Sequence, residues 1–327
     1  MDPADFYTGI VAEIYGPLKS FSQGAEPYAA FIQEAGTPAL ELGCGDGDPL
    51  LELRRRGFEV EGVDSSADML ERLRHRAREH GISVTVFHQR MEALNLPRRY
   101  RAIFLAGPTF TLLPDDNAAL ACLHSIRAHL AEDGAALVPL FIPSPTPTEQ
   151  IGQVRAATAP DGAELRVAVV GEERDEAART QTTLLRYERR HGGDDVVDER
   201  PWKLHWYTRA AFQTMVTAAD LTVTAVTDPH GNPATADATD VHFHLRVRRS
   251  VAPYAGEPVA HSETGRPRSD RLRPSGRRHH PAGPGRTGGA GPGRSAPGID
   301  RGLPYRPARL GGGVPMTPTS SATPEPA

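Results

Sequence analysis

The sequence predicts an α/β fold: a seven-stranded, mostly parallel sheet with helices on both faces, an inserted antiparallel β meander and a disordered C-terminal tail. From residue 35 to 142, short strand-like runs alternate with amphipathic helical stretches, which is typical of a parallel sheet. Between about residues 150 and 207, strands follow one another without long helices. Residues 251–327 hold 14 Gly, 14 Pro and 11 Arg, and too few large apolar side chains to offset the entropy of ordering them. We therefore expect one domain over residues 1–250, followed by a tail.

The strands of the first half are short apolar runs. Between the second and third, Met69, Leu70, Leu73 and Ala77 repeat at helical spacing, after Ser65-Ser66 and before Gly81. Between the fourth and fifth, residues 120–130 repeat in the same way, and residues 132–134 form a turn. The predicted strands are residues 39–42, 58–63, 84–87, 102–106 and 135–142.

The second half reads as a meander followed by one more helix and two strands. The turn at residues 191–194 contains two glycines and predicts a β-hairpin. A helix carries Phe212 to Ala219. Residues 241–247 alternate apolar and polar side chains, which predicts a strand with one buried face. The strands expected in this half are residues 165–170, 180–189, 196–207, 221–226 and 241–247.

Charge and composition argue against several classes of protein. The net charge of −4 divides into about −10 over residues 1–250 and about +6 over residues 251–327. An acidic body is a poor nucleic-acid binder, and two cysteines make neither a disulfide scaffold nor a cysteine-based metal site. The acidic N-terminal sequence and the short apolar runs lead us to expect a cytoplasmic protein with no membrane partner. The arginines of the tail are compatible with an RNA-contacting arm, but a dispensable extension explains them more simply.

A glycine-rich turn follows the first strand. Gly43, Gly45 and Gly47 come directly after residues 39–42, and a helix opens at Pro49. Glycines let the backbone turn sharply and let a ligand approach the main chain. A structural turn without a ligand has the same pattern.

Asp64 ends the second strand, 23 residues after Glu41. In dinucleotide-type sites an acidic residue at a similar spacing binds the two ribose hydroxyls of an adenosine. The alternative role for Asp64 is to cap the following helix.

The spacing of the glycines separates two kinds of adenosine site. A nicotinamide fingerprint has its third glycine three positions after the second, whereas Gly47 comes two positions after Gly45. The segment Glu41-Leu42-Gly43-Cys44-Gly45-Asp46-Gly47 resembles motif I of the class I S-adenosylmethionine-dependent methyltransferases of small-molecule type, which have a Rossmann-like fold. The resemblance continues through residues 60–70, 87–92 and 100–104, and it spans roughly residues 7–248.

The resemblance implies S-adenosylmethionine as the cofactor and a role for each matching position. Glu41 and the glycine turn would face the methionine portion, and Asp64 would face the ribose. Met69 and Met91 would hold the adenine ring between them, although either is compatible with simple core packing. The full set of expected cofactor-binding residues is Tyr15, Glu41, Gly43, Cys44, Gly45, Gly47, Asp64, Ser65, Met69, Gln89, Arg90, Met91, Ala106 and Gly107.

Some positions depart from the family pattern. Arg90 stands where many relatives have an aspartate that accepts the adenine amino group, and a guanidinium accepts no hydrogen bond. Adenine selection would then pass to Glu92, Gln89 or a backbone carbonyl. Asp46 and Asp48 add two carboxylates beside the site, which would favour the sulfonium and repel the methionine carboxylate.

The candidate catalytic residues are His205 and Tyr207, a base being useful if the acceptor is a hydroxyl. We expect Lys203, His205 and Tyr207 to share one strand face. Residues 108–110 and His124 are further candidates, and all of these have scaffold roles as alternatives. Methyl transfer requires no metal, and the pair His242 and His244 reads as a solvated strand face rather than a ligand pair.

The sequence thus predicts an enzyme that transfers a methyl group from S-adenosylmethionine to an N, O or C atom of a small molecule. In-line displacement at the methyl carbon needs alignment in a dry site. Two alternatives keep the same adenosine site. One is a cyclising or pericyclic enzyme that uses the cofactor structurally, and the other is a non-catalytic protein that senses S-adenosylmethionine.

Overall fold

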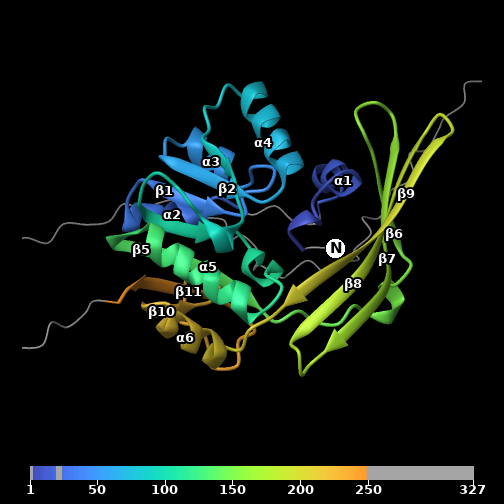
Figure 1. Cartoon of the computed structure of the whole chain (residues 1–327). Helices are drawn as coiled ribbons and strands as arrows, with labels where there is room; N and C mark the ends of the chain where they lie inside the picture. The colour runs from blue at the N-terminus through green and yellow to red at the C-terminus, as the bar shows by residue number, and fades with distance from the viewer. Residues whose placement is uncertain (1–2, 20–23, 249–327) are drawn as a thin grey trace, which may run out of the picture. The chain divides into compact units, whose positions relative to one another are not determined.

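The computed structural model describes residues 3–19 and 24–248, which form two sheets with their helices (Figure 1). The larger sheet has the strand order β10-β11-β5-β4-β1-β2-β3, and the smaller has the order β6-β7-β8-β9. These sheets confirm the predicted mostly parallel α/β architecture with an added antiparallel meander. The predicted tail, residues 251–327, lies outside the described residues.

The centre of the seven-stranded sheet is parallel, and one edge of it is antiparallel. β1 pairs in parallel with β2 and β4, whereas β11 runs antiparallel to β5 and β10. Leu42 lies opposite Val63 on β2 and Leu105 on β4, so these three strands end side by side. The loops that follow β1, β2 and β4 therefore meet at one edge of the sheet. The strands are β1 (Ala39–Leu42), β2 (Val60–Asp64), β3 (Val86–His88), β4 (Tyr100–Leu105), β5 (Leu130–Phe141), β10 (Leu221–Thr227) and β11 (Asp240–Val247).

Two apolar clusters attach helices to opposite faces of this sheet. One cluster includes Phe31, Leu50 and Leu73 from three helices on one face, and the other includes Leu123 and Phe212 from two helices on the opposite face. These side chains are almost fully buried, so their burial supplies most of the stabilisation of each layer. The helices are α2 (Glu26–Ala35), α3 (Leu50–Arg55) and α4 (Ala67–Glu79) on the first face, and α5 (Asp116–His129) and α6 (Arg209–Ala218) on the second.

The structure confirms the predicted start of one helix and shifts another helix start and a turn. The Ser66 hydroxyl accepts a hydrogen bond from the Met69 N–H and caps α4 at the predicted place. Pro49 caps α3 instead of lying in its first turn. The expected turn at residues 132–134 belongs to β5, which begins at Leu130 directly after α5 and shifts register against β4. Gly134 fits this irregularity because a Cβ there would lie 2.9 Å from the Arg101 carbonyl oxygen.

The smaller sheet is an antiparallel meander. Its strands β8 and β9 are joined at Gly192 and Gly193, which both have positive φ, so the predicted hairpin is confirmed. β6 was not expected from the sequence, because its alternation of small and polar residues is weak and its side chains are largely exposed. The strands are β6 (Val154–Thr158), β7 (Glu164–Asp175), β8 (Thr180–His191) and β9 (Asp194–His205).

Helix α1 (Ile10–Leu18) packs its apolar face on the antiparallel sheet. Ile10 and Ile14 belong to one buried cluster with Leu165 of β7 and Tyr187 of β8. Hydrogen bonds extend this attachment, since Arg200 of β9 donates to the Thr8 carbonyl oxygen at 2.9 Å. The N-terminal segment and the antiparallel sheet therefore form one packing unit. Short 3₁₀ turns complete the chain: η1 (Pro3–Asp5), η2 (Met91–Ala93), η3 (Thr109–Leu112) and η4 (Thr148–Gln150).

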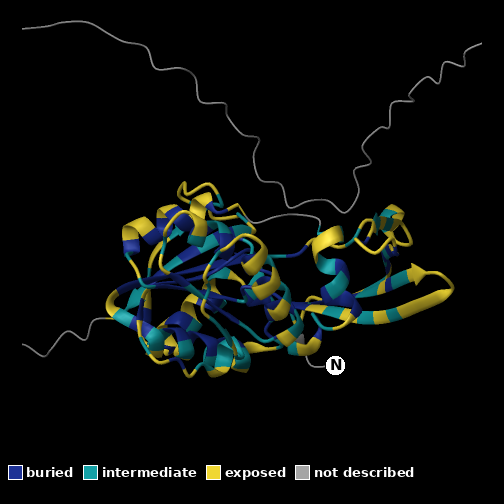
Figure 2. Ribbon diagram, turned by 90° about the horizontal axis from the view of Figure 1, so that it is seen from above, coloured by how far each residue is buried: buried dark blue, intermediate teal, exposed yellow. Residues whose placement is uncertain are grey.

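The polar face of β11 is half-buried, which corrects the expectation of a solvated face. His242 and His244 are intermediate in exposure, and the His244 ring meets Phe31 of α2 edge-on at 6.3 Å. Figure 2 shows the same gradient, with buried residues along the strands of the large sheet and exposed residues on the outer helix faces and the β8–β9 hairpin. Among the described residues, no helix is long and apolar enough to cross a bilayer, and no cluster of His, Cys, Asp and Glu is arranged to hold a metal ion.

Candidate active site

The turn after β1 follows a path that requires glycine. Gly43 has a φ of +72°, and a Cβ on it would overlap the Cγ2 of Thr109 in the segment after β4. Gly43 and Cys44 both donate their backbone N–H to the Val63 carbonyl oxygen, at 2.8 and 3.0 Å. The turn is thus fastened to β2 and lies directly against the segment after β4. Any other residue at position 43 would displace this backbone.

Asp64 connects the ends of β1 and β2. One carboxylate oxygen accepts the Gly45 N–H and the other accepts the Ser66 N–H, each at 2.8 Å. Burial raises the pKa of Asp64, while these two hydrogen bonds oppose the rise. A carboxylate has about four acceptor positions, so two remain for a ligand. Asp64 therefore has both a structural role and free acceptor capacity.

Glu41 lies on β1 beneath the same turn and is fully buried. Neither of its carboxylate oxygens has a hydrogen-bond partner among the residues that the structure describes. Burial raises the pKa of Glu41 well above its ordinary value, and the nearby Asp64 and Asp48 raise it further. A buried polar group without a partner is rare in folded proteins and requires a specific explanation. The buried carboxyl fits a site for a cationic group.

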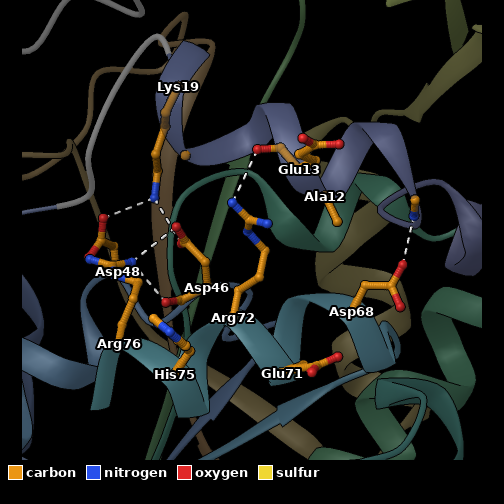
Figure 3. A pocket seen from close by; sticks show the side chains of 12 residues that line it. Ala12, Glu13, Lys19, Asp46, Asp48, Asp68, Glu71, Arg72, His75 and Arg76 are labelled. Carbon is orange, nitrogen blue, oxygen red and sulfur yellow. Dashed lines mark hydrogen bonds and ion pairs between the residues drawn. The ribbon is translucent and has the colours of Figure 1, made fainter. Parts of the chain in front are cut away.

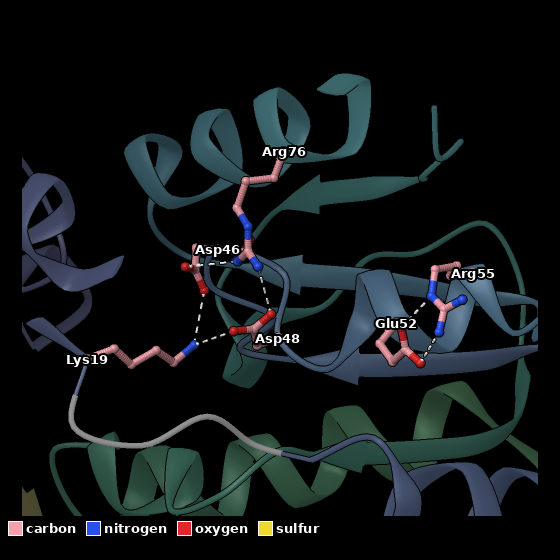
Figure 4. A network of polar contacts seen from close by, with 6 residues as sticks. All are labelled: Lys19, Asp46, Asp48, Glu52, Arg55 and Arg76. Carbon is pink, nitrogen blue, oxygen red and sulfur yellow. Dashed lines mark hydrogen bonds and ion pairs between the residues drawn. The ribbon is translucent and has the colours of Figure 1, made fainter. Parts of the chain in front are cut away.

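Four side chains tie the glycine turn to α1 and α4 (Figure 4). The Lys19 ammonium lies 3.3 Å from an Asp46 carboxylate oxygen and 3.0 Å from one of Asp48. The Arg76 guanidinium contacts the same two carboxylates at 3.0 and 2.9 Å. We call Lys19, Asp46, Asp48 and Arg76 the ion quartet. It corrects the expectation that Asp46 and Asp48 act as free carboxylates toward the cofactor, because each has two cationic partners.

A polar cavity of about 720 Å³ separates α1 from α4 (Figure 3). Contacts cross it at several points: Asp68 accepts the Gly9 N–H at 2.6 Å, and Arg72 donates to the Glu13 carbonyl oxygen at 3.1 Å. The ion quartet lies at one end of the cavity. α1 therefore contacts the glycine turn and α4 through polar groups, and the antiparallel sheet through its apolar face and the Glu13–Arg189 ion pair.

Comparisons with known proteins agree with this geometry. A family described as "Methyltransferase domain" matches residues 39–134, the part of the chain from β1 to the start of β5. The chain carries a class I S-adenosylmethionine-dependent methyltransferase domain. S-adenosylmethionine supplies the methyl group in the reaction of such a domain.

The similarity to individual proteins extends beyond this methyltransferase domain. The chain is 28% identical over 235 residues, 68% of its length and 87% of the relative's, to a dTDP-3-amino-3,6-dideoxy-alpha-D-glucopyranose N,N-dimethyltransferase of Streptomyces fradiae. The solved structure of the CcbJ methyltransferase of Streptomyces caelestis has a TM-score of 0.57 and 23% identity, with 76% of this chain and 96% of that one covered. A methyltransferase structure from Clostridium acetobutylicum has the same TM-score at 15% identity, over 72% and 97% of the chains. These structures share the fold.

The residues expected around the methionine and ribose portions of the cofactor meet at one edge of the methyltransferase domain. Glu41, the glycine turn and Asp64 lie at the adjoining ends of β1 and β2. Cys44 is buried, with its Sγ against Gly62, and burial raises the pKa of its thiol well above the ordinary value, so its side chain packs. The orphaned carboxyl of Glu41 and the free acceptor positions of Asp64 fit the cationic and hydroxyl groups of S-adenosylmethionine.

The structure places the residues expected around the adenine in different surroundings. Met69 is buried in the first turn of α4, with its Cε 3.5 Å from where a Cβ on Gly45 would lie, and Met91 is partly buried at η2. Gln89 makes two hydrogen bonds to the backbone of Asn95, at 2.8 and 3.1 Å. Arg90 pairs with Glu92 at 2.6 Å. Gln89 thus has a structural role in this arrangement.

Ala106 and Gly107 follow β4, and both backbone groups already have protein partners. The Ala106 carbonyl oxygen accepts the Thr109 hydroxyl at 2.8 Å, and the Gly107 N–H donates to the Tyr28 hydroxyl at 3.0 Å. Tyr28 in turn stacks on Phe104, with centroids 5.1 Å apart. A carbonyl oxygen has a second lone pair, so Ala106 remains able to accept from a ligand.

The N-terminal segment covers the end of β2. The Ser65 hydroxyl donates to the Ala4 carbonyl oxygen at 3.3 Å, and the Ser66 hydroxyl donates to that of Tyr7 at 2.5 Å. Tyr7 and Tyr15 meet edge-on at 5.6 Å, and the Lys19 ammonium lies 4.9 Å from the Tyr15 ring centre. Ser65 thereby contacts the N-terminal segment, and Tyr15 lies beside the Lys19 ammonium of the ion quartet.

His205 and Tyr207 form a buried polar pair at the end of β9. The His205 Nδ1 lies 2.8 Å from the Tyr207 hydroxyl oxygen, and its Nε2 lies 3.7 Å from an Asp116 carboxylate oxygen. Burial lowers the pKa of His205, and the nearby Arg179 lowers it further, so the imidazole is neutral at neutral pH. β9 ends at His205, so Tyr207 is not on the strand, and Lys203 is exposed.

The remaining candidates from the sequence were His124 and residues 108–110, of which Phe110 contacts the Tyr207 ring. His124 is exposed on α5, and Phe110 is buried in the core. Sequence reasoning missed the quartet members Lys19 and Arg76. For Arg76 the one signal was its position one helical turn after Arg72 on the same helix face, and for Lys19 there was no local signal.

Proposed function

We propose that this protein N-methylates the amino group of a small amino sugar carried on a nucleotide. The observation that supports this acceptor is the similarity to the Streptomyces fradiae amino-sugar N,N-dimethyltransferase, which extends over 87% of that enzyme and so includes regions outside the shared cofactor domain. The antiparallel sheet and α1 lie outside the family match at residues 39–134. Acceptor identity is expected to depend on these segments.

The proposed chemistry places modest demands on the protein. The methyl carbon is already activated by the sulfonium, so the site must align a neutral amine with it and exclude water. A protonated amine has no lone pair, and a base that holds its proton therefore accelerates transfer. We assign this role to His205, with Tyr207 as its hydrogen-bond partner. The neutral imidazole and the position of Tyr207 against Phe110 of η3, at a ring distance of 5.4 Å, support this assignment.

The proposal includes action in the cytoplasm on a soluble acceptor, without nucleic-acid or membrane partners. The negative charge of residues 1–250 supports this part of it. Residues 1–250 are proposed to act as one domain, with residues 150–207 covering the acceptor, and the tail from 251 onward is proposed to be dispensable.

A paired-acceptor assay tests the function. The purified protein is incubated with S-adenosylmethionine and either a nucleotide-linked 3-amino sugar or its 3-hydroxy counterpart. We expect the mass of the amino sugar to increase by one or two methyl groups, with one S-adenosylhomocysteine formed for each methyl group added, and no product from the hydroxy sugar. Methylation of the hydroxy sugar alone would overturn N-methylation. Rearranged product without S-adenosylhomocysteine would indicate a cyclising or pericyclic enzyme, and cofactor binding without product from either sugar would leave the sensor alternative.

A further inference from the structure

Glu41 is placed where an ionised carboxylate is unfavourable. Its register partners are Gly62 on β2 and Phe104 on β4, so it lies on the sheet face that carries the apolar cluster of α2, α3 and α4. Its side chain is 0% exposed, and neither oxygen has a hydrogen-bond partner among the described residues. Ionisation in such surroundings requires a counter-charge, and without one the group takes up a proton.

The charged groups around Glu41 do not supply that counter-charge. Asp64 faces it from β2, and Asp46 and Asp48 face it from the glycine turn. Lys19 acts on Glu41 as a cation, but its ammonium contacts both Asp46 and Asp48, which Arg76 also contacts. Tyr15 faces the cluster from α1, and burial raises the pKa of its phenol, so it stays neutral. Among the described groups, the negative charges around Glu41 exceed the positive ones.

We infer that Glu41 carries a proton in the ligand-free enzyme and releases it to solvent when the cationic cosubstrate binds. S-adenosylmethionine has a sulfonium and an ammonium against one carboxylate, and so brings a net charge of plus one. In the proposed exchange the O–H bond of the acid breaks, and the carboxylate formed remains as the counter-charge of the ligand. The raised pKa of Glu41 agrees with this state of the free enzyme. The inference concerns the cosubstrate site and does not depend on the acceptor.

Two other groups lie near the site and must be distinguished from Glu41. Asp64 also has a pKa raised by burial, but two backbone N–H groups bind its carboxylate. His88 is exposed at the end of β3, with its Nε2 2.8 Å from the Ser65 carbonyl oxygen. The Glu41→Gln variant distinguishes them, because glutamine has the shape of the protonated acid and no charge at any pH.

Titration calorimetry of the full chain with S-adenosylmethionine measures the proton count. The titration is run from pH 5.5 to 7.0, below the range around 7.7 in which α-amino groups begin to titrate. At each pH, two buffers of different ionisation enthalpy are compared. We expect the wild-type chain to release close to one proton per ligand and its affinity to rise by up to about tenfold per pH unit. Glu41→Gln is expected to release none and to show an affinity that does not change with pH.

A matched control is Glu61→Gln on β2. The Glu61 carboxylate already has protein partners, since it pairs with Arg98 at 2.7 Å and accepts the Tyr100 hydroxyl at 2.6 Å, so this variant should retain the wild-type proton release. If Glu41→Gln does not fold, infrared difference spectra of the wild-type chain replace it, and the protonated-acid carbonyl band should disappear on S-adenosylmethionine binding. A wild-type chain that releases no proton, or a Glu41→Gln variant that still releases one, would overturn the inference. Neither result would affect the proposed N-methylation.

Discussion

Asp64 has two roles, and two substitutions of it are expected to weaken ligand binding to different extents. It holds the Gly45 and Ser66 N–H groups and, in our assignment, the ribose hydroxyls. We expect Asp64→Ala to weaken S-adenosylmethionine binding by about 1 to 3 kcal/mol, through lost charge-assisted hydrogen bonds. Asp64→Asn should weaken it less, because the amide oxygen still accepts one N–H. Calorimetry on both variants measures the loss, and Asp133→Ala, an exposed site far from the turn, is the control. Unchanged affinity in Asp64→Ala would place the ribose elsewhere.

The His205–Tyr207 pair gives a second test on single residues. If His205 holds the amine proton, His205→Gln should lower kcat by about 10² to 10⁴ and leave the cosubstrate Kd unchanged. Tyr207→Phe should lower kcat less, because it removes one hydrogen bond at 2.8 Å and keeps the imidazole. Because burial lowers the pKa of His205, the wild-type rate should fall only in acid, below the ordinary range of histidine. A wild-type rate in His205→Gln would show that the pair only supports the fold.

The ion quartet operates at the level of whole elements, because it joins α1, the glycine turn and α4. Lys19→Met leaves Asp46 and Asp48 with Arg76 as their only quartet cation, and we expect a loss of about 1 to 3 kcal/mol of stability, since hydrogen bonds to charged groups are strong. Amide exchange of residues 10–18 should accelerate. Arg55→Met removes an exposed ion pair with Glu52 on α3, and it should change neither the stability nor the amide exchange of residues 10–18. Unaltered exchange in Lys19→Met would mean that the apolar packing and the other polar contacts of α1 hold it without Lys19.

Helices, strands and turns could be predicted from the sequence where residues close together in the chain determine them. The strand 39–42, the Ser66 cap and the two-glycine hairpin are encoded within a few residues, and the structure has each of them at its expected place. β6 was missed because pairing with β7, and not its own pattern, makes it a strand. Lys19 and Arg76 were missed for a related reason. Their partners are 27 to 30 residues away, and no local pattern indicates which carboxylate a long cation reaches.

The free energy of unfolding in acid depends on the whole molecule, and His242 on β11 contributes to it. Burial lowers the pKa of His242 to about 4, so the folded chain binds this proton less readily than the unfolded chain does. The contribution of His242 to the free energy of unfolding is fully present above pH 6.5 and is lost as the pH falls toward 4. Asp240, with a pKa raised to about 6 by burial, changes stability in the opposite direction over part of that range. We expect His242→Gln to flatten the acid limb of a urea-denaturation series by about 1 to 3 kcal/mol. An unchanged slope would show that His242 is not the group responsible.

The extent of the domain is testable by truncation. A chain ending at Ser250 should keep the Tm and the cosubstrate Kd of the full chain, because the Gly, Pro and Arg content of residues 251–327 gives little apolar surface to bury. Thermal melts and calorimetry on both chains compare them. A Tm lower by several degrees in the shorter chain would assign the tail a structural role.

The packing of α1 on the antiparallel sheet has a consequence for engineering this enzyme. Ile10 and Ile14 share their cluster with Leu165 and Tyr187, so the first helix and a segment more than 140 residues later are complementary in shape. A chimaera that receives a new antiparallel sheet from another methyltransferase should therefore also receive that enzyme's N-terminal helix. The junctions belong after Lys19 and on either side of residues 154–205, where the grafted pieces would leave the cofactor strands intact.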